Sequence, residues 1–235
     1  MGRDHVQLIA RREERSLATW MFLLTAVSGL VDAFSYLQLG HVFVANMTGN
    51  IVFVGFALAG APGLSLFSSA VAVVSFFLGA LAAGRLARSV QFTRPGLLRA
   101  LAVTETVMVL IAIGIAFMPA PPGSLTAHGI IALLAAAMGI QSATTTRLAI
   151  PGFNSTVVLT TMISTLAASS HLGGGSGADN GRRLLAIGSM LAGGLVGAAL
   201  TLRLIKQAPL WLAALVLLVA GLGAQLATGR LRQNQ

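Results

Sequence analysis

The sequence predicts an all-α fold: a polytopic transmembrane helix bundle with about six crossings, two re-entrant or broken segments and an inverted repeat. Two observations predict this class. Of the 235 residues, 56% are hydrophobic and only 9% are charged, which is far outside the usual soluble range. Apolar runs of about 20 residues, long enough to cross a bilayer as helices, also recur along the whole chain. We expect one transmembrane domain at 17–228, with a cytoplasmic N-terminal segment at 1–16 and a cytoplasmic tail at 229–235.

Eight apolar segments are candidate crossings, and short stretches rich in Gly, Pro or Arg separate them. They lie at residues 17–39, 42–61, 66–88, 97–118, 127–147, 153–172, 184–204 and 209–228.

The Lys and Arg residues indicate how many of these segments cross, because positive residues in short loops concentrate on the cytoplasmic side. If all eight segments cross, eight positive residues fall inside and seven outside. If the second and sixth segments instead enter the membrane and return, five arginines between residues 85 and 147 move inside, and the count becomes thirteen against two. We therefore expect six crossings and two segments, 42–61 and 153–172, that do not simply span.

The two halves of the chain, 17–118 and 127–228, resemble each other. "GLVDA" at 29–33 is similar to "GIQSA" at 139–143, an offset of 110, and "SFFLGALAAG" at 75–84 is similar to "SMLAGGLVGA" at 189–198, an offset of 114. Two registers are open for the middle: "NMTGN" opposite "TMIST", or one Asn-x-Thr triplet opposite the other. Three crossings and one re-entrant element per half would invert the second half, an arrangement known from transporters and channels.

Small residues at four-residue spacing mark two of the segments as closely packed helices. They are Gly79, Ala83, Gly193 and Gly197. Such spacing lets helix backbones approach each other inside a membrane. It favours packing over chemistry at these positions.

The stretch "GLVDAFSYLQLGHVFVANMTGNIVFVGFAL" resembles the signature of the YoaK-like family of bacterial membrane proteins, whose function is unknown. The similarity extends through "GIQSATTTRL" and "TTMIST" over nearly the whole chain. Ser164 and Thr165 stand where the family tends to have a Thr-Gly pair. The resemblance implies a multi-pass protein of the bacterial cytoplasmic (inner) membrane, and it carries over no biochemical activity.

Two acidic residues, Asp32 and Glu105, lie inside predicted spans. Intramembrane carboxylates are costly, so they are candidates for binding a proton or a cation. The alternative for each is a buried, hydrogen-bonded packing role. Burial disfavours the ionised form of a carboxylate, whereas a bound cation stabilises it. Asp32 is the leading candidate and Glu105 the reserve.

Polar residues inside the two non-spanning segments, together with Gln141 at the polar end of the crossing 127–147, complete the candidate site for a solute or ion. In the first half, Asn46, Thr48 and Asn50 could satisfy free backbone groups or face a solute, and we expect them to share a cavity with Asp32. In the second half the candidates are Gln141, Thr161 and Ser164. The four histidines have no ligand spacing and there is no cysteine, so neither a metal site nor a cofactor is expected.

Two function classes remain: a small-solute secondary transporter or channel, and a non-transporting scaffold that binds lipid or a protein partner. An enzyme is not expected, because no HExxH motif occurs and "GLSLF" around Ser65 lacks the last glycine of a nucleophile elbow. The expected partners are the lipid bilayer, an unidentified solute or ion, and optionally further copies of the chain. Nucleic acid is not among them, since the net charge of +9 comes from arginines at the ends of apolar runs.

Overall fold

The computed structural model describes the backbone of residues 3–89, 93–148, 159–170, 174–175 and 180–233, and within these ranges the regular structure is entirely helical. Eight helices follow the eight predicted apolar segments in order. They are α1 (Arg3–Gln38), α2 (Met47–Leu58), α3 (Leu66–Ser89), α4 (Arg94–Ala116), α5 (Leu125–Leu148), α6 (Leu159–Ser169), α7 (Asn180–Arg203) and α8 (Ala208–Gln233).

The lengths of the helices separate spanning from non-spanning elements. At about 1.5 Å per residue, α2 with 12 residues and α6 with 11 residues reach less than 20 Å. That is too short for a hydrocarbon core of about 30 Å. Helices α1, α3, α4, α5 and α7 are long and apolar enough to cross. Helix α8 has 26 residues, and the stretch of it whose side chains are described, Ala208–Gly223, is apolar. Segment 42–61 is therefore not a simple span, as predicted, and the described part of segment 153–172 is too short to be one; residues 149–158 and 171–173 lie outside the described part.

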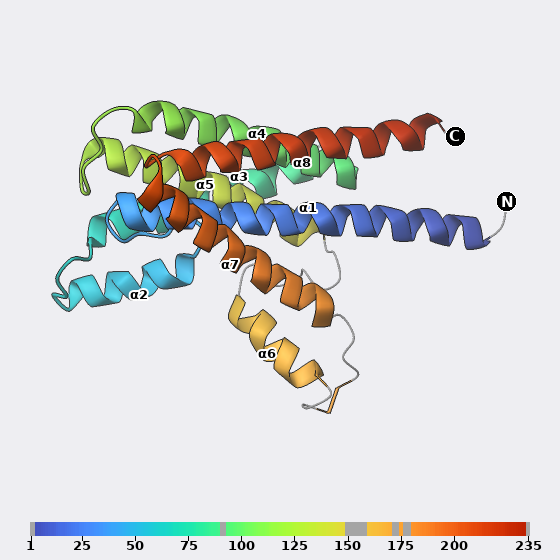
Figure 1. Cartoon of the computed structure of the whole chain (residues 1–235), viewed down its shortest axis with the longest axis horizontal. Helices are drawn as coiled ribbons and strands as arrows, with labels where there is room; N and C mark the ends of the chain where they lie inside the picture. Colours follow the sequence, from blue (N-terminus) through green and yellow to red (C-terminus); the bar gives the residue numbers. More distant parts are fainter. Residues whose placement is uncertain (1–2, 90–92, 149–158, 171–173, 176–179, 234–235) are drawn as a thin grey trace.

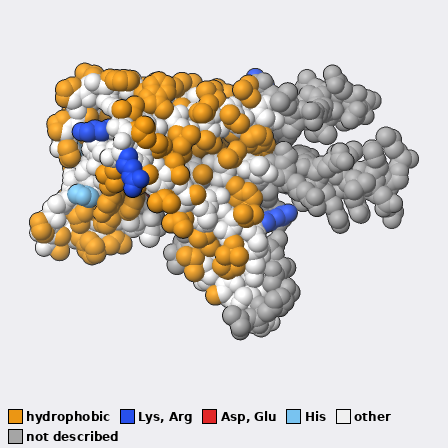
Figure 2. All heavy atoms as spheres, in the orientation of Figure 1, with side chains coloured by type: hydrophobic (Ala, Val, Ile, Leu, Met, Phe, Trp, Pro, Cys, Tyr) orange, Lys and Arg blue, Asp and Glu red, His pale blue; other side chains and the backbone are white. Residues whose placement is uncertain are grey.

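The surface of the bundle is suited to lipid. On the face drawn in Figure 2, hydrophobic side chains cover most of the described surface, and Lys and Arg are few. The large hydrophobic side chains exposed on the bundle include Phe77, Leu191 and Trp211. A soluble protein does not expose apolar area on this scale, because water penalises it. The fold is that of a multi-pass membrane protein.

The packing of the helices is nearly symmetric between the two halves of the chain. Helix α3 packs on α5, and correspondingly α7 packs on α1; α4 packs on α5 as α8 packs on α1; and α2 packs on α3 as α6 packs on α7. The α4–α8 contact is its own counterpart. Exchanging α1–α4 with α5–α8 therefore maps these contacts onto one another, as an internal two-fold relation requires. The α7–α8 contact is the exception, since α3 and α4 make no equally extensive one.

Glycines bring α3 and α5 into backbone contact. A Cβ atom at Gly79 would overlap the carbonyl oxygen of Ala136, and one at Gly139 would overlap the carbonyl oxygen of Phe76. No side chain fits at either glycine unless a helix backbone moves. The close fit of the two helix surfaces therefore fixes the position of α3 relative to α5.

The same contact recurs between α1 and α7. A Cβ atom at Gly193 would overlap the carbonyl oxygen of Ala26, and one at Gly29 would lie 2.5 Å from the carbonyl oxygen of Met190. These residues correspond to those of the α3–α5 contact in the repeat: Gly29 corresponds to Gly139 at the offset of 110, and Gly193 to Gly79 at the offset of 114. The predicted repeat is present in the packing, and the predicted close packing at Gly79, Gly193 and Gly197 is confirmed.

The two repeats are inverted. Helices α1, α4 and α7 run in one direction along the bundle, and α3, α5 and α8 run in the other (Figure 1). Equivalent helices such as α1 and α5 are therefore antiparallel. The start of α1 and the end of α8 lie at the same end of the bundle, as expected for an even number of crossings.

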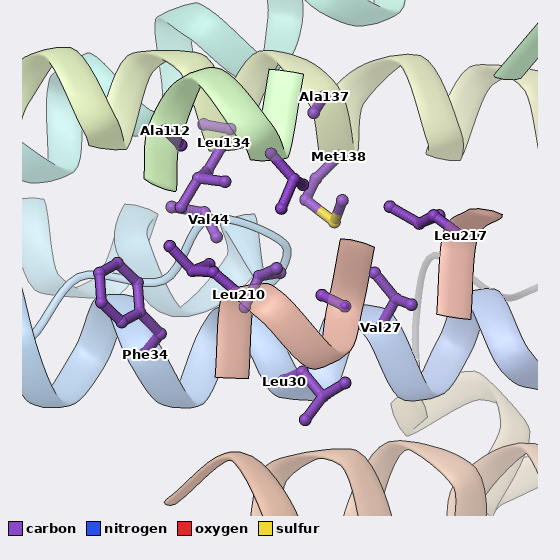
Figure 3. Close-up of a cluster of buried hydrophobic side chains, with 14 of the residues drawn as sticks. Val27, Leu30, Phe34, Val44, Ala112, Leu134, Ala137, Met138, Leu210 and Leu217 are labelled. Atoms are coloured by element: carbon purple, nitrogen blue, oxygen red, sulfur yellow. The ribbon is translucent and has the colours of Figure 1, made fainter. Parts of the chain in front are cut away.

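The hydrophobic core lies where the repeats meet. Figure 3 shows Val27 and Phe34 of α1 directed toward side chains from α4, from the other half and from the segment before α2, whereas Leu30 points to the other side of α1. These partners are Val44, Ala112, Leu134, Ala137, Met138, Leu210 and Leu217. Most of the core is built between α1, α4, α5 and α8, and α3, α6 and α7 each add a buried side chain, namely Ala72, Met162 and Ala186.

The topology predicts the pattern of cysteine labelling. Single cysteines introduced at Arg88, near the end of α3, or at Arg99, in the second turn of α4, are expected to resist a membrane-impermeant thiol reagent added to intact cells. They should react after permeabilisation, because the positive residues around the α3–α4 connection predict that it lies inside. A cysteine at Gly63, between α2 and α3, is expected to react from outside. The chain has no cysteine of its own to interfere. Labelling of Arg88→Cys from outside would restore eight full crossings.

Candidate functional site

Asp32 lies on the buried face of α1, in the part that crosses the membrane, and it binds the backbone of the segment that leads to α2. Its Oδ1 atom accepts hydrogen bonds from the backbone N–H groups of Val44 at 2.8 Å and Ala45 at 2.7 Å. Only 5% of the residue is exposed. Its Oδ2 atom is also buried and has no hydrogen-bond partner within the described residues. One carboxylate oxygen is thus used to hold the chain, and the other is left over.

Asn50, on the first turn of α2, holds the same segment from the other side. Its Oδ1 atom accepts a hydrogen bond from Phe43 N at 3.0 Å, and its Nδ2 atom donates to Phe43 O at 2.6 Å. The side chain is fully buried. The backbone of Phe43 is not helical and cannot satisfy its own N–H and C=O groups. The Asn50 amide bonds to both of them, as is required for backbone groups buried in a membrane.

Aromatic rings complete the packing of this segment. The Phe43 ring stacks on Tyr36 of α1, with centroids 5.0 Å apart, and on Phe53 of α2 at 5.7 Å. Gly49 makes room for it, since a Cβ atom there would come within 2.9 Å of the Phe43 ring. We call residues 39–46, which connect α1 to α2, the first crossover.

Gln141 on α5 joins the two repeats near the middle of the bundle. Its Nε2 atom donates to Ser28 Oγ at 2.8 Å and approaches the Leu24 carbonyl oxygen at 3.4 Å. Ser28 in turn lies 3.9 Å from the Met138 sulfur. Ser28 and Met138 are equivalent at the offset of 110, so the axis that relates the repeats passes close to this pair. Ser28 also lies one turn before Asp32 on α1, which brings both onto one helix face.

Glu105 occupies the buried face of α4, with no exposed area. The same face carries Ala102, whose Cβ would lie 3.5 Å from a Cβ at Gly221 of α8, so it is turned toward the α4–α8 contact. The extensive helix contacts do not include one between α1 and α4. Glu105 and Asp32 therefore belong to different parts of the bundle.

The remaining candidates depart from the shared cavity that the sequence predicts. The side chains of Asn46 and Thr48 are exposed, although their neighbour Asn50 is buried. Thr161 and Ser164 of α6 are also exposed, and the Ser164 hydroxyl donates to the Thr161 carbonyl oxygen of its own helix. Because α2 packs on α3 and α6 on α7, these two helices do not face each other. The structure brings together Asp32 and Asn50 at the first crossover, and Gln141 with Ser28 one turn away.

Sequence reasoning missed Ser28 and the backbone of the first crossover. Ser28 is a common residue type, and the available signals were its place one turn before Asp32 and its offset of 110 from Met138. The role of Val44 and Ala45 depends on their N–H groups. Every residue except proline has such a group, so the side chains of Val44 and Ala45 give no sign of this role. Within the described residues, His, Asp and Glu side chains form no group of three that could hold a metal ion.

The fold and the candidate site define the class as a polytopic helical membrane protein with buried polar residues between inverted repeats. Comparison with known proteins agrees: the chain belongs to the family described as protein of unknown function (DUF1275), which matches residues 20–223. It is 35% identical over 153 residues to the UPF0700 transmembrane protein YoaK of Bacillus subtilis (strain 168), which covers 63% of this chain. The matched part spans 65% of that relative's length. No solved structure matches the chain.

Proposed function

We propose that this protein moves a small polar solute or an ion across the bacterial cytoplasmic membrane, as a secondary transporter or channel and not as an enzyme. The observation that carries the proposal is the inverted repeat with a short helix after the first crossing of each half, too short over its described residues to span the membrane. Interrupted segments at corresponding positions of inverted repeats are the recurring architecture of secondary transporters. Their binding sites lie near the midplane, where the repeats meet.

Asp32 supports coupling to a proton or a cation. Its Oδ2 atom is a buried acceptor with no hydrogen-bond partner within the described residues. A proton or a desolvated cation is the natural partner for such an atom, and intramembrane carboxylates commonly serve that role. Glu105, fully buried on α4, is the second candidate. With only short loops between helices, an ion gradient is a more suitable energy source than nucleotide hydrolysis.

A scaffold that binds lipid or a protein partner is the alternative, and one observation favours it. Asp32 Oδ1, Asn50 and Gln141 all make hydrogen bonds that hold the crossover or join two helices. Polar residues used in this way stabilise a membrane fold without binding a solute. The two functions differ in whether Asp32 has a role beyond holding the chain.

The test is reconstitution into liposomes that contain a pH-sensitive dye, with an imposed proton gradient. Amino acids, sugars and monovalent cations are added singly to wild type, Asp32→Asn and Glu105→Gln. We expect one solute class to evoke proton or solute flux in wild type, and Asp32→Asn to reduce it about tenfold or more, since an amide cannot carry the proton. Thr48→Ala is the matched control at an exposed polar position. Flux that Asp32→Asn leaves unchanged would remove Asp32 from the mechanism, and no flux with any solute would favour the scaffold.

A further inference from the structure

The two pairs of helices in backbone contact, α3–α5 and α1–α7, form the centres of two bodies in the bundle. Helices α2, α3, α4 and α5 pack on one another, and so do α1, α6, α7 and α8. We call the first set the central body, because it is a continuous piece of chain, and the second the terminal body. Between them, the α4–α8 contact is extensive and the α1–α5 contact is sparse. The repeat symmetry exchanges the two bodies.

The α3–α5 and α1–α7 contacts inside the bodies are closer than the α4–α8 contact between the bodies. Inside, backbones touch, at Gly79 and Gly139 in the central body and at Gly29 and Gly193 in the terminal body. Touching backbones cannot slide without a clash. At the α4–α8 contact between the bodies, by contrast, a Cβ at Gly221 would be at an ordinary 3.5 Å from the Ala102 side chain. Side chains can exchange rotamers and permit shear or rotation between packed helices.

The sparse α1–α5 contact, which we call the seam, carries the buried polar side chains of the candidate site. Gln141 of the central body donates to Ser28 of the terminal body at 2.8 Å. Asp32 lies one turn further along α1 on the same face as Ser28. Polar groups in such a seam provide hydrogen bonds for a solute when the seam opens, and they bond to each other when it is closed.

The first crossover is tied to both bodies. Asp32 of the terminal body holds the N–H groups of Val44 and Ala45, and Asn50 of the central body holds both backbone groups of Phe43. At the offset of 110, the position equivalent to Asp32 is Ser142, which has no carboxylate. The contact between the Asp32 carboxylate and the first crossover therefore has no counterpart in the second half, and this structure shows the contact formed.

We propose that the central and terminal bodies rock against each other about the α4–α8 pair, opening the α1–α5 seam past Ser28, Asp32 and Gln141 as the solute pathway, with the Asp32–crossover contact as a latch at one end. This inference rests on the proposed function, because it assigns the moving parts and the pathway of the same transporter. The relative motion of the two bodies can be measured even when the solute is not known.

Distance measurements between paired spin labels in lipid nanodiscs test the motion. Three double-cysteine variants of the cysteine-free chain are used. Pro62 and Ile205 pair the two bodies at the end that carries the first crossover, and Arg88 with Leu184 pairs them at the opposite end. Pro62 with Leu125 is the control pair inside the central body. Each pair is measured in the wild-type background, in Asp32→Asn and in Thr48→Ala.

We expect two distance populations for each pair between bodies, with opposite shifts at the two ends, and one population for the control pair. Asp32→Asn should increase the open population at the crossover end about twofold, because a neutral acceptor binds backbone N–H groups less strongly than a carboxylate. Thr48→Ala should not. A single narrow distance for both pairs between bodies, in wild type and Asp32→Asn alike, would overturn the proposal. Two populations without solute flux would keep the motion and reject transport, whereas flux with rigid distances would reject the motion and keep a channel.

Discussion

Replacing Gly139 with alanine is expected to lower the apparent Tm of the purified protein by roughly 5–10 °C. A Cβ atom at this position would overlap the carbonyl oxygen of Phe76, so α3 and α5 would have to separate. Overpacking a closely packed interface costs about 1–3 kcal/mol or more, and in a chain of this size each kcal/mol shifts Tm by about 2–4 °C. The loss of the monodisperse fraction on heating in detergent measures the effect.

The matched control is Gly129→Ala on the same helix. A Cβ atom at Gly129 meets no atom within 4 Å, so this change should leave the Tm unchanged or raise it slightly through helix propensity. Because the repeat places Gly29 where Gly139 stands, Gly29→Ala should destabilise the protein to a similar extent. Equal Tm values for Gly139→Ala and Gly129→Ala would show that the α3–α5 backbones are not in contact.

Asp32→Ala is expected to destabilise the protein strongly, and Asp32→Asn much less. Alanine leaves the N–H groups of Val44 and Ala45 buried without their acceptor, at a cost of about 1–3 kcal/mol each. Asparagine retains a carbonyl oxygen that can accept both bonds. The expected order of Tm is therefore wild type, then Asp32→Asn, then Asp32→Ala, with a gap of roughly 5–10 °C between the two variants.

This series separates the two roles of Asp32. If Asp32 only holds the crossover, flux and stability should fall together along the series. If its Oδ2 atom binds a proton or cation, Asp32→Asn should lose flux while it remains folded. Thr48→Ala, at an exposed position on α2 just after the first crossover, should change neither. A Tm for Asp32→Ala within about 1 °C of wild type would show that the crossover does not depend on this carboxylate.

The sequence alone determined the class of protein and the number of its elements. Hydrophobic length and the distribution of positive charge are properties of the chain itself, set by the thickness of the bilayer and by the positive-inside rule. They predicted the eight segments and the two of them that fold as short helices, α2 and α6. The offsets of 110 and 114 predicted the repeat, because the glycines that permit close packing recur in both halves.

The sequence identified Asp32, Asn50 and Gln141 as buried polar residues, and the structure places all three inside the bundle. It also assigned Asn46, Thr48, Thr161 and Ser164 to the same cavity, which the structure does not support. Neighbouring residues on a short helix point in different directions, so a polar cluster in sequence does not define a cluster in space. Only the start and direction of α2 decide that Asn50 faces inward and Thr48 outward.

What the tertiary structure decided is which helices pair and what the polar groups bind. Each first helix packs on the third helix of the other half, α1 on α7 and α5 on α3, and the chain order does not reveal this exchange. Asp32 binds backbone N–H groups twelve and thirteen residues away, and any residue type could supply those groups. Helix formation in a membrane is fixed locally, since every backbone group must be satisfied there. Which helices pack together depends on where glycines let two backbones come into contact. The helix surfaces that make these contacts exist only after the helices have formed.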